Sequence, residues 1–435
     1  MSENNAIALV DCNNFFVSCE RAVNAKLKER PVVVLSNNDG CIISRSDEVK
    51  QMGVQMAQPL FQVRELLEAH NTAIISCNHA LYHSFADRIL NILINEVGES
   101  SVELYSIDEA FLDAGPPDKL KLFGTHIRDR ILKETNIPVS VGITETKTLA
   151  KVANHLAKKS AKTKGVLDLY HSPYTDVALK RTEIGDVWGV GRRSAVKLKE
   201  RGINTAFELK LADPEKIRGY LNVFGARTVL ELNGIKCLPL ETTERDNKSI
   251  AHTRTFGKAL SSREEIRNAV FFFTTRAMEK MRWNGLATRS VSVFLQTDRH
   301  RPDPYYYSNA CSYRSIYHSD VTSEIYRWVA SCFEQAYRPG LKYRRAGIVL
   351  HELAPAKTIS IRLYDQADFE RWSRLNRSID ELNLRYGRDV IRPAILHDKG
   401  GWQSQSTHRS NDANHNVERE RLGLGKTFSR SVRFL

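Results

Sequence analysis

Short apolar runs alternate with amphipathic stretches through the first 165 residues and predict a mixed α/β fold. Strands are expected at residues 7–10, 31–36, 41–44 and 138–143, an acidic hairpin at 102–112, and helices at 82–97, 119–135 and 146–159. The strands at 31–36 and 41–44 flank an Asn-Asn-Asp-Gly turn, which indicates a hairpin because these residue types tolerate positive φ.

The pattern changes after residue 165. Residues 166–240 form short helical segments interrupted by turns, and the polar, aperiodic stretch 241–248 is typical of a linker. Apolar periodicity returns over residues 249–352, where the expected order β-α-β-β-α-β corresponds to a known small sheet-and-helix unit and predicts an independent domain. Beyond it the pattern fades, and residues 399–435, rich in Gly, Ser and Asn, are expected to be disordered in part.

Three carboxylates stand where apolar strands end. Asp11 closes the strand at 7–10, and Asp108 and Glu109 lie where the acidic hairpin turns. Neighbouring strand residues point to opposite faces, so Asp108 and Glu109 share a ligand only if the chain bends there. Three acids held together need a neutralising cation, and Mg²⁺ is the hard ion that carboxylates select. Solvated turn residues would explain the Asp-Glu pair alone, but the third acid favours a metal site.

Aromatic and basic residues surround these acids in the sequence. Phe15 and Phe16 follow Asp11 and either wall a substrate pocket or pack in the core. Six cations could hold a triphosphate: Arg45, Lys50, Lys147, Lys151, Lys158 and Lys159. Three of them, Lys147, Lys151 and Lys158, recur at near-helical spacing and predict one basic helix face. A solvated surface position is the alternative for each single lysine.

The segment 187–193, Val-Trp-Gly-Val-Gly-Arg-Arg, has the form of a helix-hairpin-helix motif. Gly189 and Gly191 would let the backbone approach a phosphate, and Arg192 and Arg193 add charge at a helix N-terminus. The motif predicts binding to a nucleic-acid backbone independently of sequence. An ordinary Gly-rich helix connection is the alternative, but Lys197 and Lys199 downstream favour nucleic acid. A second aromatic stretch, Tyr305-Tyr-Tyr307, either stacks on bases or forms the buried face of a strand.

The composition indicates which kind of partner and which cellular compartment to expect. The formal charge is +13, and residues 245–355 hold 18 Lys and Arg against 10 Asp and Glu, which points to a polyanionic partner. An ordinary basic protein is the alternative. The 435 residues predict two to four domains. Seven scattered cysteines without a Cys-x-x-Cys pair argue against disulfides and structural zinc, and no long apolar stretch or signal segment occurs, so a cytoplasmic protein is expected.

Five motifs together resemble those of the Y-family translesion DNA polymerases, and most closely the UmuC branch. They are Asp11-Cys-Asn-Asn-Phe-Phe-Val-Ser-Cys-Glu20, Val32-Val-Val-Leu-Ser-Asn-Asn-Asp-Gly-Cys41, Tyr105-Ser-Ile-Asp-Glu-Ala-Phe111, Gly142-Ile-Thr-Glu-Thr-Lys-Thr-Leu-Ala-Lys151 with Ala153-Asn-His155, and Val187-Trp-Gly-Val-Gly-Arg-Arg193. The resemblance covers residues 6–352 in order. It implies an α+β multidomain, right-hand polymerase.

The domains implied by this resemblance follow the composition changes. They are a ferredoxin-like palm (1–24 and 76–165), small fingers (25–75), a helix-hairpin-helix thumb (166–240), a linker (241–248), a βαββαβ little finger (249–355) and a partly disordered tail (356–435). The implied reaction is template-directed, error-prone DNA synthesis past lesions during the SOS response. Family members of this kind have an open active site that tolerates damaged bases, which lowers fidelity.

The resemblance also assigns roles to individual residues. Asp11, Asp108 and Glu109, with the carbonyl of Cys12, would hold two Mg²⁺ ions for nucleotidyl transfer to a primer 3′-hydroxyl. Phe16 matches the steric gate that excludes a 2′-hydroxyl. The residues matched to nucleotide binding are Phe15, Phe16, Arg45, Lys50 and Lys158.

The implied partners are primed DNA and deoxynucleotides, a UmuD′-like dimer, a RecA filament and the sliding clamp, at the nucleoid and not at a membrane. At the expected clamp peptide, Leu363 and Tyr364 could fill an apolar pocket, but Ser360 replaces the usual Gln. Two other functions share parts of the pattern. One is a template-independent nucleotidyltransferase such as a nucleotide cyclase, and the other is a non-enzymatic DNA-binding scaffold that recruits other polymerases.

Overall fold

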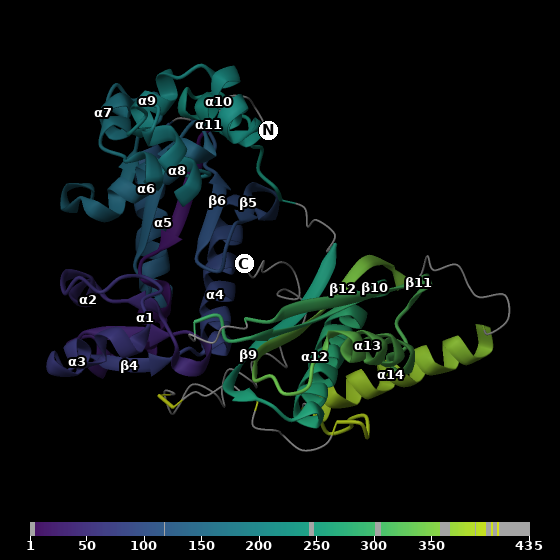
Figure 1. Cartoon of the computed structure of the whole chain (residues 1–435). Helices are drawn as coiled ribbons and strands as arrows, with labels where there is room; N and C mark the ends of the chain where they lie inside the picture. Colours follow the sequence, from purple (N-terminus) through teal and green to yellow (C-terminus); the bar gives the residue numbers. More distant parts are fainter. Residues whose placement is uncertain are drawn as a thin grey trace. The chain divides into compact units, whose positions relative to one another are not determined.

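The computed structural model describes residues 5–116, 118–242, 248–300, 306–356, 366–387, 389–396, 402 and 407–408. The chain divides into two compact units (Figure 1). The N-terminal unit comprises Met1–Leu35, Cys41–Glu244 and His408–Leu435, and the second unit comprises Ser36–Gly40 and Arg245–Thr407. Both units combine sheets with helices, which confirms the expected α+β class.

A five-stranded sheet in the order β5-β6-β1-β7-β8 forms the centre of the N-terminal unit. Its strands are β1 (Ile7–Cys12), β5 (Val102–Leu104), β6 (Glu109–Asp113), β7 (Val139–Thr144) and β8 (Val166–Asp168). Neighbours are antiparallel except β7 and β8, which run parallel. The central strand β1 is buried along its whole length, which agrees with the apolar run from Ile7 to Val10.

Helices cover both faces of this sheet. Side chains of α4 (His79–Val97) and α5 (Leu120–Thr135) pack with Ala8 and Val10 in one core. On the other face, α6 (Lys147–Lys159) lies against β7 and β1. These three helices confirm the predictions at 82–97, 119–135 and 146–159.

Gly142 on β7 permits the close packing of α6. A Cβ atom at this position would lie 2.3 Å from the backbone nitrogen of Asn154 and 2.5 Å from the carbonyl oxygen of Ala150. Any side chain would therefore push the helix away from the sheet. Asn154 fastens the helix further, because its side-chain Nδ2 donates to the Ser140 carbonyl at 2.7 Å.

A smaller three-stranded sheet, β3-β2-β4, lies in the segment expected to form the fingers. Its elements are β2 (Val32–Leu35), β3 (Ile42–Arg45), α2 (Asp47–Gln51), α3 (Leu60–Ala69) and β4 (Ala73–Ser76). The antiparallel pairing of β2 with β3 confirms the expected hairpin. Its turn contains positive φ at Asn38 and Asp39, as the residue types indicated. The sequence predictions did not cover α3 and β4.

Short helices follow in residues 166–240 as expected. They are α7 (Thr175–Lys180), α8 (Arg192–Lys199), α9 (Ala206–Leu211), α10 (Pro214–Leu221) and α11 (Val223–Leu232). Their shared core includes Leu149, Val152 and Ala153 of α6. Helix α6 therefore packs on the central sheet with one side and on these short helices with the other.

The second unit contains an antiparallel sheet in the order β11-β10-β12-β9. Its elements are β9 (Ser249–Leu260), α12 (Arg263–Trp283), β10 (Leu286–Thr297), β11 (Ser308–Ser319), α13 (Thr322–Ala336) and β12 (Tyr343–Pro355). This series confirms the predicted β-α-β-β-α-β order. Strand β11 begins at Ser308, later than the aromatic stretch expected to start it, and of that stretch only Tyr306 and Tyr307 are described.

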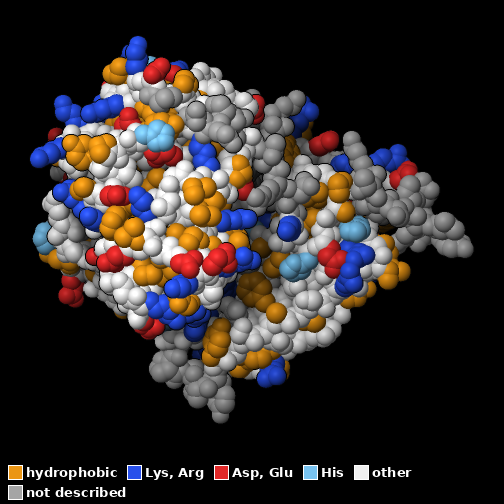
Figure 2. All heavy atoms as spheres, turned by 90° about the horizontal axis from the view of Figure 1, so that it is seen from above, with side chains coloured by type: hydrophobic (Ala, Val, Ile, Leu, Met, Phe, Trp, Pro, Cys, Tyr) orange, Lys and Arg blue, Asp and Glu red, His pale blue; other side chains and the backbone are white. Residues whose placement is uncertain are grey.

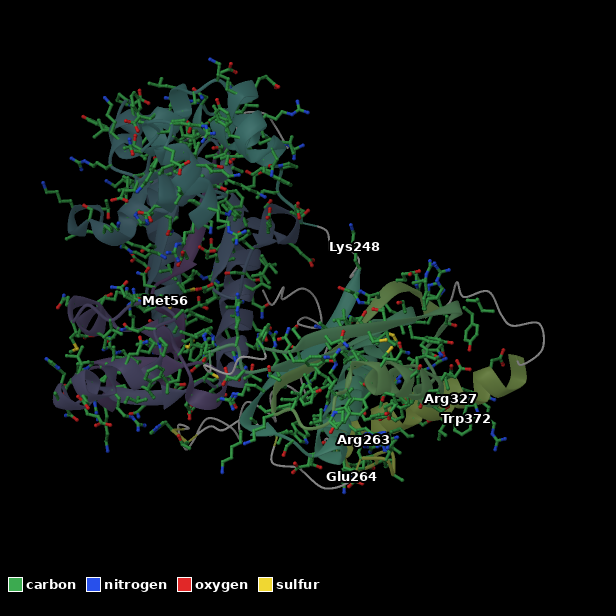
Figure 3. All side chains as sticks on the ribbon, viewed as in Figure 1. Met56, Lys248, Arg263, Glu264, Arg327 and Trp372 are labelled. Carbon is green, nitrogen blue, oxygen red and sulfur yellow. The ribbon has the colours of Figure 1, made fainter. Side chains whose placement is uncertain are left out.

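A helix of 21 residues, α14 (Gln366–Tyr386), lies in the C-terminal region that the sequence predictions left without structure. It is held by polar contacts: Arg282 Nε donates to Asp380 Oδ2 at 2.6 Å, and Ser373 Oγ donates to Asp320 Oδ1 at 2.6 Å. Trp372, labelled on this helix in Figure 3, is 47% exposed. Helix α14 was missed although Trp372, Leu375, Ile379 and Leu382 recur at helical spacing in its sequence.

The described part of the chain contains no helix long and apolar enough to cross a membrane. Ser360, Leu363 and Tyr364, the residues of the expected clamp peptide, lie outside the described residues. On the face that Figure 2 shows, Lys and Arg side chains are spread among acidic and apolar ones.

Candidate active site

The sheet register brings the predicted acids together. Asp11 on β1 lies directly opposite Glu109 on β6, and their side chains share a hydrogen bond. The backbone nitrogen of Cys12 donates to the carbonyl oxygen of Asp108 at 2.9 Å, which holds the turn before β6 against the end of β1. The three acids thus occupy one end of the central sheet, as their positions at strand ends predicted.

Burial and mutual repulsion disturb the ionisation of these acids. Desolvation, together with the neighbouring Glu109, raises the pKa of Asp11 to about 7 against the opposing effect of Lys158. Desolvation also raises the pKa of Asp108, although Ser106 Oγ donates a hydrogen bond to its Oδ1 at 2.6 Å. Burial opposes ionisation of Glu109 too, but Lys151 and the hydrogen bond from Asp11 outweigh it and lower the pKa of Glu109.

Two lysines of α6 neutralise this end of the sheet. Lys158 Nζ lies 2.5 Å from Asp11 Oδ1, and Lys151 Nζ lies 2.7 Å from each carboxylate oxygen of Glu109. The sequence placed both lysines near the site but could not pair them with particular acids. With the lysines in these positions, part of the negative charge is compensated by the protein itself.

Lys147 does not belong to the predicted basic helix face. Its side chain is only 4% exposed and forms an ion pair with Glu103 of β5, and Nζ also donates to the Pro239 carbonyl at 2.8 Å. Lys147 therefore stabilises the interior and does not face a substrate. The spacing with Lys151 and Lys158 was right, but the chain around Pro239 covers the first turn of α6.

The donor set is suited to a hard divalent cation. Its ligands would be the oxygens of Asp11, Asp108 and Glu109 and the Cys12 carbonyl. The pKa of about 7 for Asp11 indicates that the Asp11–Glu109 pair retains a proton near neutral pH, which a divalent cation would displace. As the side chains stand, no three His, Cys, Asp or Glu residues in the described ranges are arranged to coordinate one ion. Metal binding would therefore require some of these side chains to rearrange.

Phe15 and Phe16 have different environments on α1 (Phe15–Val23). Phe15 is 3% exposed and belongs to the core, whereas Phe16 is partly buried and stacks on Tyr82, with ring centroids 4.5 Å apart. Tyr82 is fixed in turn, because its hydroxyl donates to Glu20 Oε1 at 2.8 Å and Glu20 is fully buried. Sequence reasoning missed Glu20 and Tyr82, although an acid on the buried face of a helix is a signal.

Arg45 and Lys50 lie on β3 and α2, in the expected fingers. Lys50 Nζ pairs with Asp47 Oδ1 at 2.8 Å, and Asn14 donates to the same oxygen at 3.1 Å. Among the described residues, Nε and Nη1 of Arg45 are buried without a hydrogen-bond partner. Buried donors of this kind are costly unless a ligand accepts from them, so Arg45 remains a candidate anion-binding residue.

The predicted backbone-binding motif ends at the start of α8. Gly189 has φ +87°, a conformation that favours glycine, and Gly191 immediately precedes the helix. Arg192 and Arg193 are exposed on its first turn. These groups can approach a phosphate backbone without rearranging the core.

Comparison with protein families gives three matches. Residues 10–155 match the impB/mucB/samB family and residues 247–363 match the C-terminal domain of that family. Residues 373–417, which include most of α14, match a domain of unknown function (DUF4113).

Curated relatives match over most of their length. Protein UmuC of Salmonella typhimurium is 37% identical over 88% of this chain and 92% of the relative. Protein MucB of Escherichia coli is 35% identical over 83% of this chain and 86% of the relative. DNA polymerase IV of Moorella thermoacetica is 29% identical over 91% of this chain and 97% of the relative.

Solved structures share the fold at low sequence identity. A Y-family DNA polymerase chimera of Dbh and Dpo4 has a TM-score of 0.63 at 20% identity and covers 80% of this chain and 98% of its own. The insertion ternary complex of Dbh DNA polymerase has a TM-score of 0.53 with the same coverage.

Proposed function

The chain belongs to the UmuC branch of the Y-family DNA polymerases and is a DNA-directed DNA polymerase; on this premise we propose that Asp11, Asp108 and Glu109 are its catalytic acids. The observation that carries the proposal is the register of the central sheet, which sets Asp11 opposite Glu109 with Asp108 at the adjoining turn. The proposed reaction is error-prone synthesis across damaged template bases, as part of an SOS response.

The three acids and the Cys12 carbonyl would hold two Mg²⁺ ions, which would acidify the primer 3′-hydroxyl and bind the triphosphate. The protein supplies carboxylates that are already close together, at the expense of burying their charge. Lys158, which is 35% exposed in its ion pair with Asp11, can turn from this acid to the incoming triphosphate. Arg45 and Lys50 would bind the same anion.

Phe16 would select the sugar. An aromatic ring held by stacking cannot move aside for a 2′-hydroxyl, and Tyr82 provides that support at 4.5 Å. Phe15 would form part of the pocket wall behind Phe16, because the Phe15 ring lies in the core.

DNA would be held at the backbone. Gly189, Gly191, Arg192 and Arg193 would contact phosphates, and the basic residues between 245 and 355 would bind the duplex without reading its sequence. A UmuD′-like dimer, a RecA filament and the sliding clamp remain proposed partners, the last through Ser360, Leu363 and Tyr364.

The decisive experiment is primer extension by an Asp108→Ala variant on damaged and undamaged templates. We expect incorporation to fall on the order of a thousandfold or more, while affinity for primed DNA changes less than about twofold. The matched control is Asp129→Ala, which removes an exposed aspartate of α5. Synthesis retained by Asp108→Ala would contradict the proposed catalytic acids. Product formed without primed template would instead indicate a template-independent nucleotidyltransferase.

A further inference from the structure

Three aromatic rings surround the ammonium group of Lys151. Its Nζ lies 4.4 Å from the ring centroid of Tyr105, 5.8 Å from that of Phe111 and 6.0 Å from that of Trp188. Tyr105 precedes the acidic turn, Phe111 lies on β6, and Trp188 immediately precedes Gly189 of the proposed DNA-binding motif. Residues far apart in the chain therefore form one cation-binding cage.

The rings fix one another. Trp188 Nε1 donates to the hydroxyl of Tyr105 at 3.0 Å, and the two rings meet edge to face with centroids 5.6 Å apart. Phe111 contacts both, at 5.6 Å from Tyr105 and 5.9 Å from Trp188. Tyr105, Phe111 and Trp188 together form the cage. Because each ring touches the other two, the loss of one loosens the remaining pair.

The lysine in the cage contacts a proposed catalytic acid with two hydrogen bonds. Lys151 Nζ donates to both oxygens of Glu109 at 2.7 Å, which fixes the direction in which the carboxylate points. The aromatic rings cover other directions from which water could solvate the ammonium, and partial exclusion of water strengthens the ion pair. The Glu109 carboxylate is thus held before any substrate arrives.

The second lysine at the site provides an internal contrast. Lys158 is 35% exposed and Lys151 is 16% exposed. Within the described ranges, no aromatic ring lies over Lys158. Lys158 is therefore less restrained than Lys151, which contacts both the rings and the carboxylate.

We infer that Lys151 and its cage are positioning residues that orient Glu109 for nucleotidyl transfer, and that Trp188 links this orientation to the thumb motif that binds DNA. This inference rests on the proposed role of Glu109. Trp188 and Gly189 are adjacent, so a backbone shift of the motif moves the indole and alters the cage. Binding of the duplex to the motif is in this way coupled to the orientation of the Glu109 carboxylate.

The test measures single-turnover incorporation, DNA affinity and the Mg²⁺ concentration for half-maximal rate. We expect Trp188→Leu and Tyr105→Leu to lower the maximal rate about 10- to 100-fold and to raise the Mg²⁺ requirement, because the carboxylate loses its orientation. The matched variants Trp188→Phe and Tyr105→Phe keep a ring beside Lys151 and should lose distinctly less. DNA affinity should change less than about twofold, since the cage does not include the glycines or arginines of the motif.

The double variant Trp188→Leu/Lys151→Gln tests whether Trp188 acts through Lys151 or independently of it. If Trp188 acts through Lys151, the double variant is no slower than Lys151→Gln alone. Multiplying losses, or weaker DNA binding with a normal rate and Mg²⁺ requirement, would overturn the inference. If Trp188→Leu fails to fold, the comparison of Tyr105→Leu with Tyr105→Phe decides in its place. Normal kinetics of these variants beside an inactive Asp108→Ala would reject the cage alone, whereas an active Asp108→Ala would reject the proposed function.

Discussion

The two units of the chain place their charged groups differently. The N-terminal unit buries ionisable residues, among them Glu20, Glu231 and Lys147. The second unit also buries arginines in ion pairs, with Arg282 6% exposed beside Asp380, but it has exposed pairs where Glu352 meets Arg289 and Arg314. A buried charge has to stay paired, because desolvation makes an unpaired buried charge costly. The two charges of an exposed pair can instead separate and be solvated by water. Buried pairs therefore position groups, and exposed pairs leave basic side chains free to follow a flexible polyanion.

Glu231 shows how a buried acid joins two regions of the N-terminal unit. Its Oε2 accepts from the backbone nitrogen of Thr148 at 3.0 Å, in the first turn of α6. Its Oε1 accepts from the backbone nitrogens of Cys237 and Leu238 at 2.8 and 3.1 Å. One carboxylate thus completes the N-terminus of α6 and fixes the chain that follows α11.

The Lys147–Glu103 pair provides a second such connection beside it. Lys147 Nζ donates to Glu103 and to the Pro239 carbonyl, and Glu103 Oε2 also accepts from the backbone nitrogen of Glu241 at 2.7 Å. The chain before the expected linker is therefore attached to the central sheet through buried charges. Lys147 and Lys151, one turn apart on α6, have different partners. Lys151 pairs with Glu109 of the candidate site, and Lys147 pairs with Glu103 and stabilises the structure around that site.

The largest effect is expected from breaking the buried pair. Lys147→Met should lower the free energy of unfolding of the N-terminal unit by about 3–5 kcal/mol, because Glu103 would be left buried without its cation. Denaturant unfolding monitored on the full chain measures this change. The matched control, Lys159→Met, removes an exposed lysine from the other end of α6 and should cost little. Equal destabilisation by the two variants would contradict the distinction between buried and exposed charges.

A smaller and more specific effect is expected at the proposed sugar gate. Tyr82→Leu removes the ring that supports Phe16, so ribonucleotide incorporation relative to deoxynucleotide incorporation should rise on the order of 10-fold. Tyr82→Phe keeps the stacked ring and loses only the hydroxyl bound to Glu20, and it should retain more of the selectivity. Single-nucleotide insertion assays with matched sugars give the ratio. Unchanged selectivity in Tyr82→Leu would show that Phe16 needs no support from Tyr82.

The sequence predicted the parts of this molecule that local patterns determine. Strand ends predicted the meeting of Asp11 with Glu109, because apolar strands that end in acids align them at one sheet edge. Apolar periods likewise predicted the β-α-β-β-α-β order of the second unit. The burial of Lys147 could not be predicted, because it depends on a contact with the Pro239 carbonyl, about 90 positions later in the chain. Helix α14 was missed although its apolar residues recur at helical spacing. Of these, Trp372, Leu375 and Leu382 are exposed, and the buried positions among its described side chains are polar.

The smallest effect is expected at the exposed pair of the second unit. Arg314 Nε donates to Glu352 Oε1 at 2.7 Å, and with Arg289 it lowers the pKa of Glu352 to about 2. Because the folded-state pKa is below the unfolded value, the contribution to stability is present above pH 4.5 and is lost as the pH falls through about 2. Glu352→Gln should therefore lower the thermal midpoint at pH 7 by a few degrees at most, less at high salt, and the difference from the parent protein should vanish towards pH 2. Glu334→Gln, which removes the exposed partner of Arg263, is the matched control and should behave alike. A loss as large as that of Lys147→Met, or one insensitive to salt, would mean that the surface pair positions structure as the buried pairs do, and the contrast between the two units would fail.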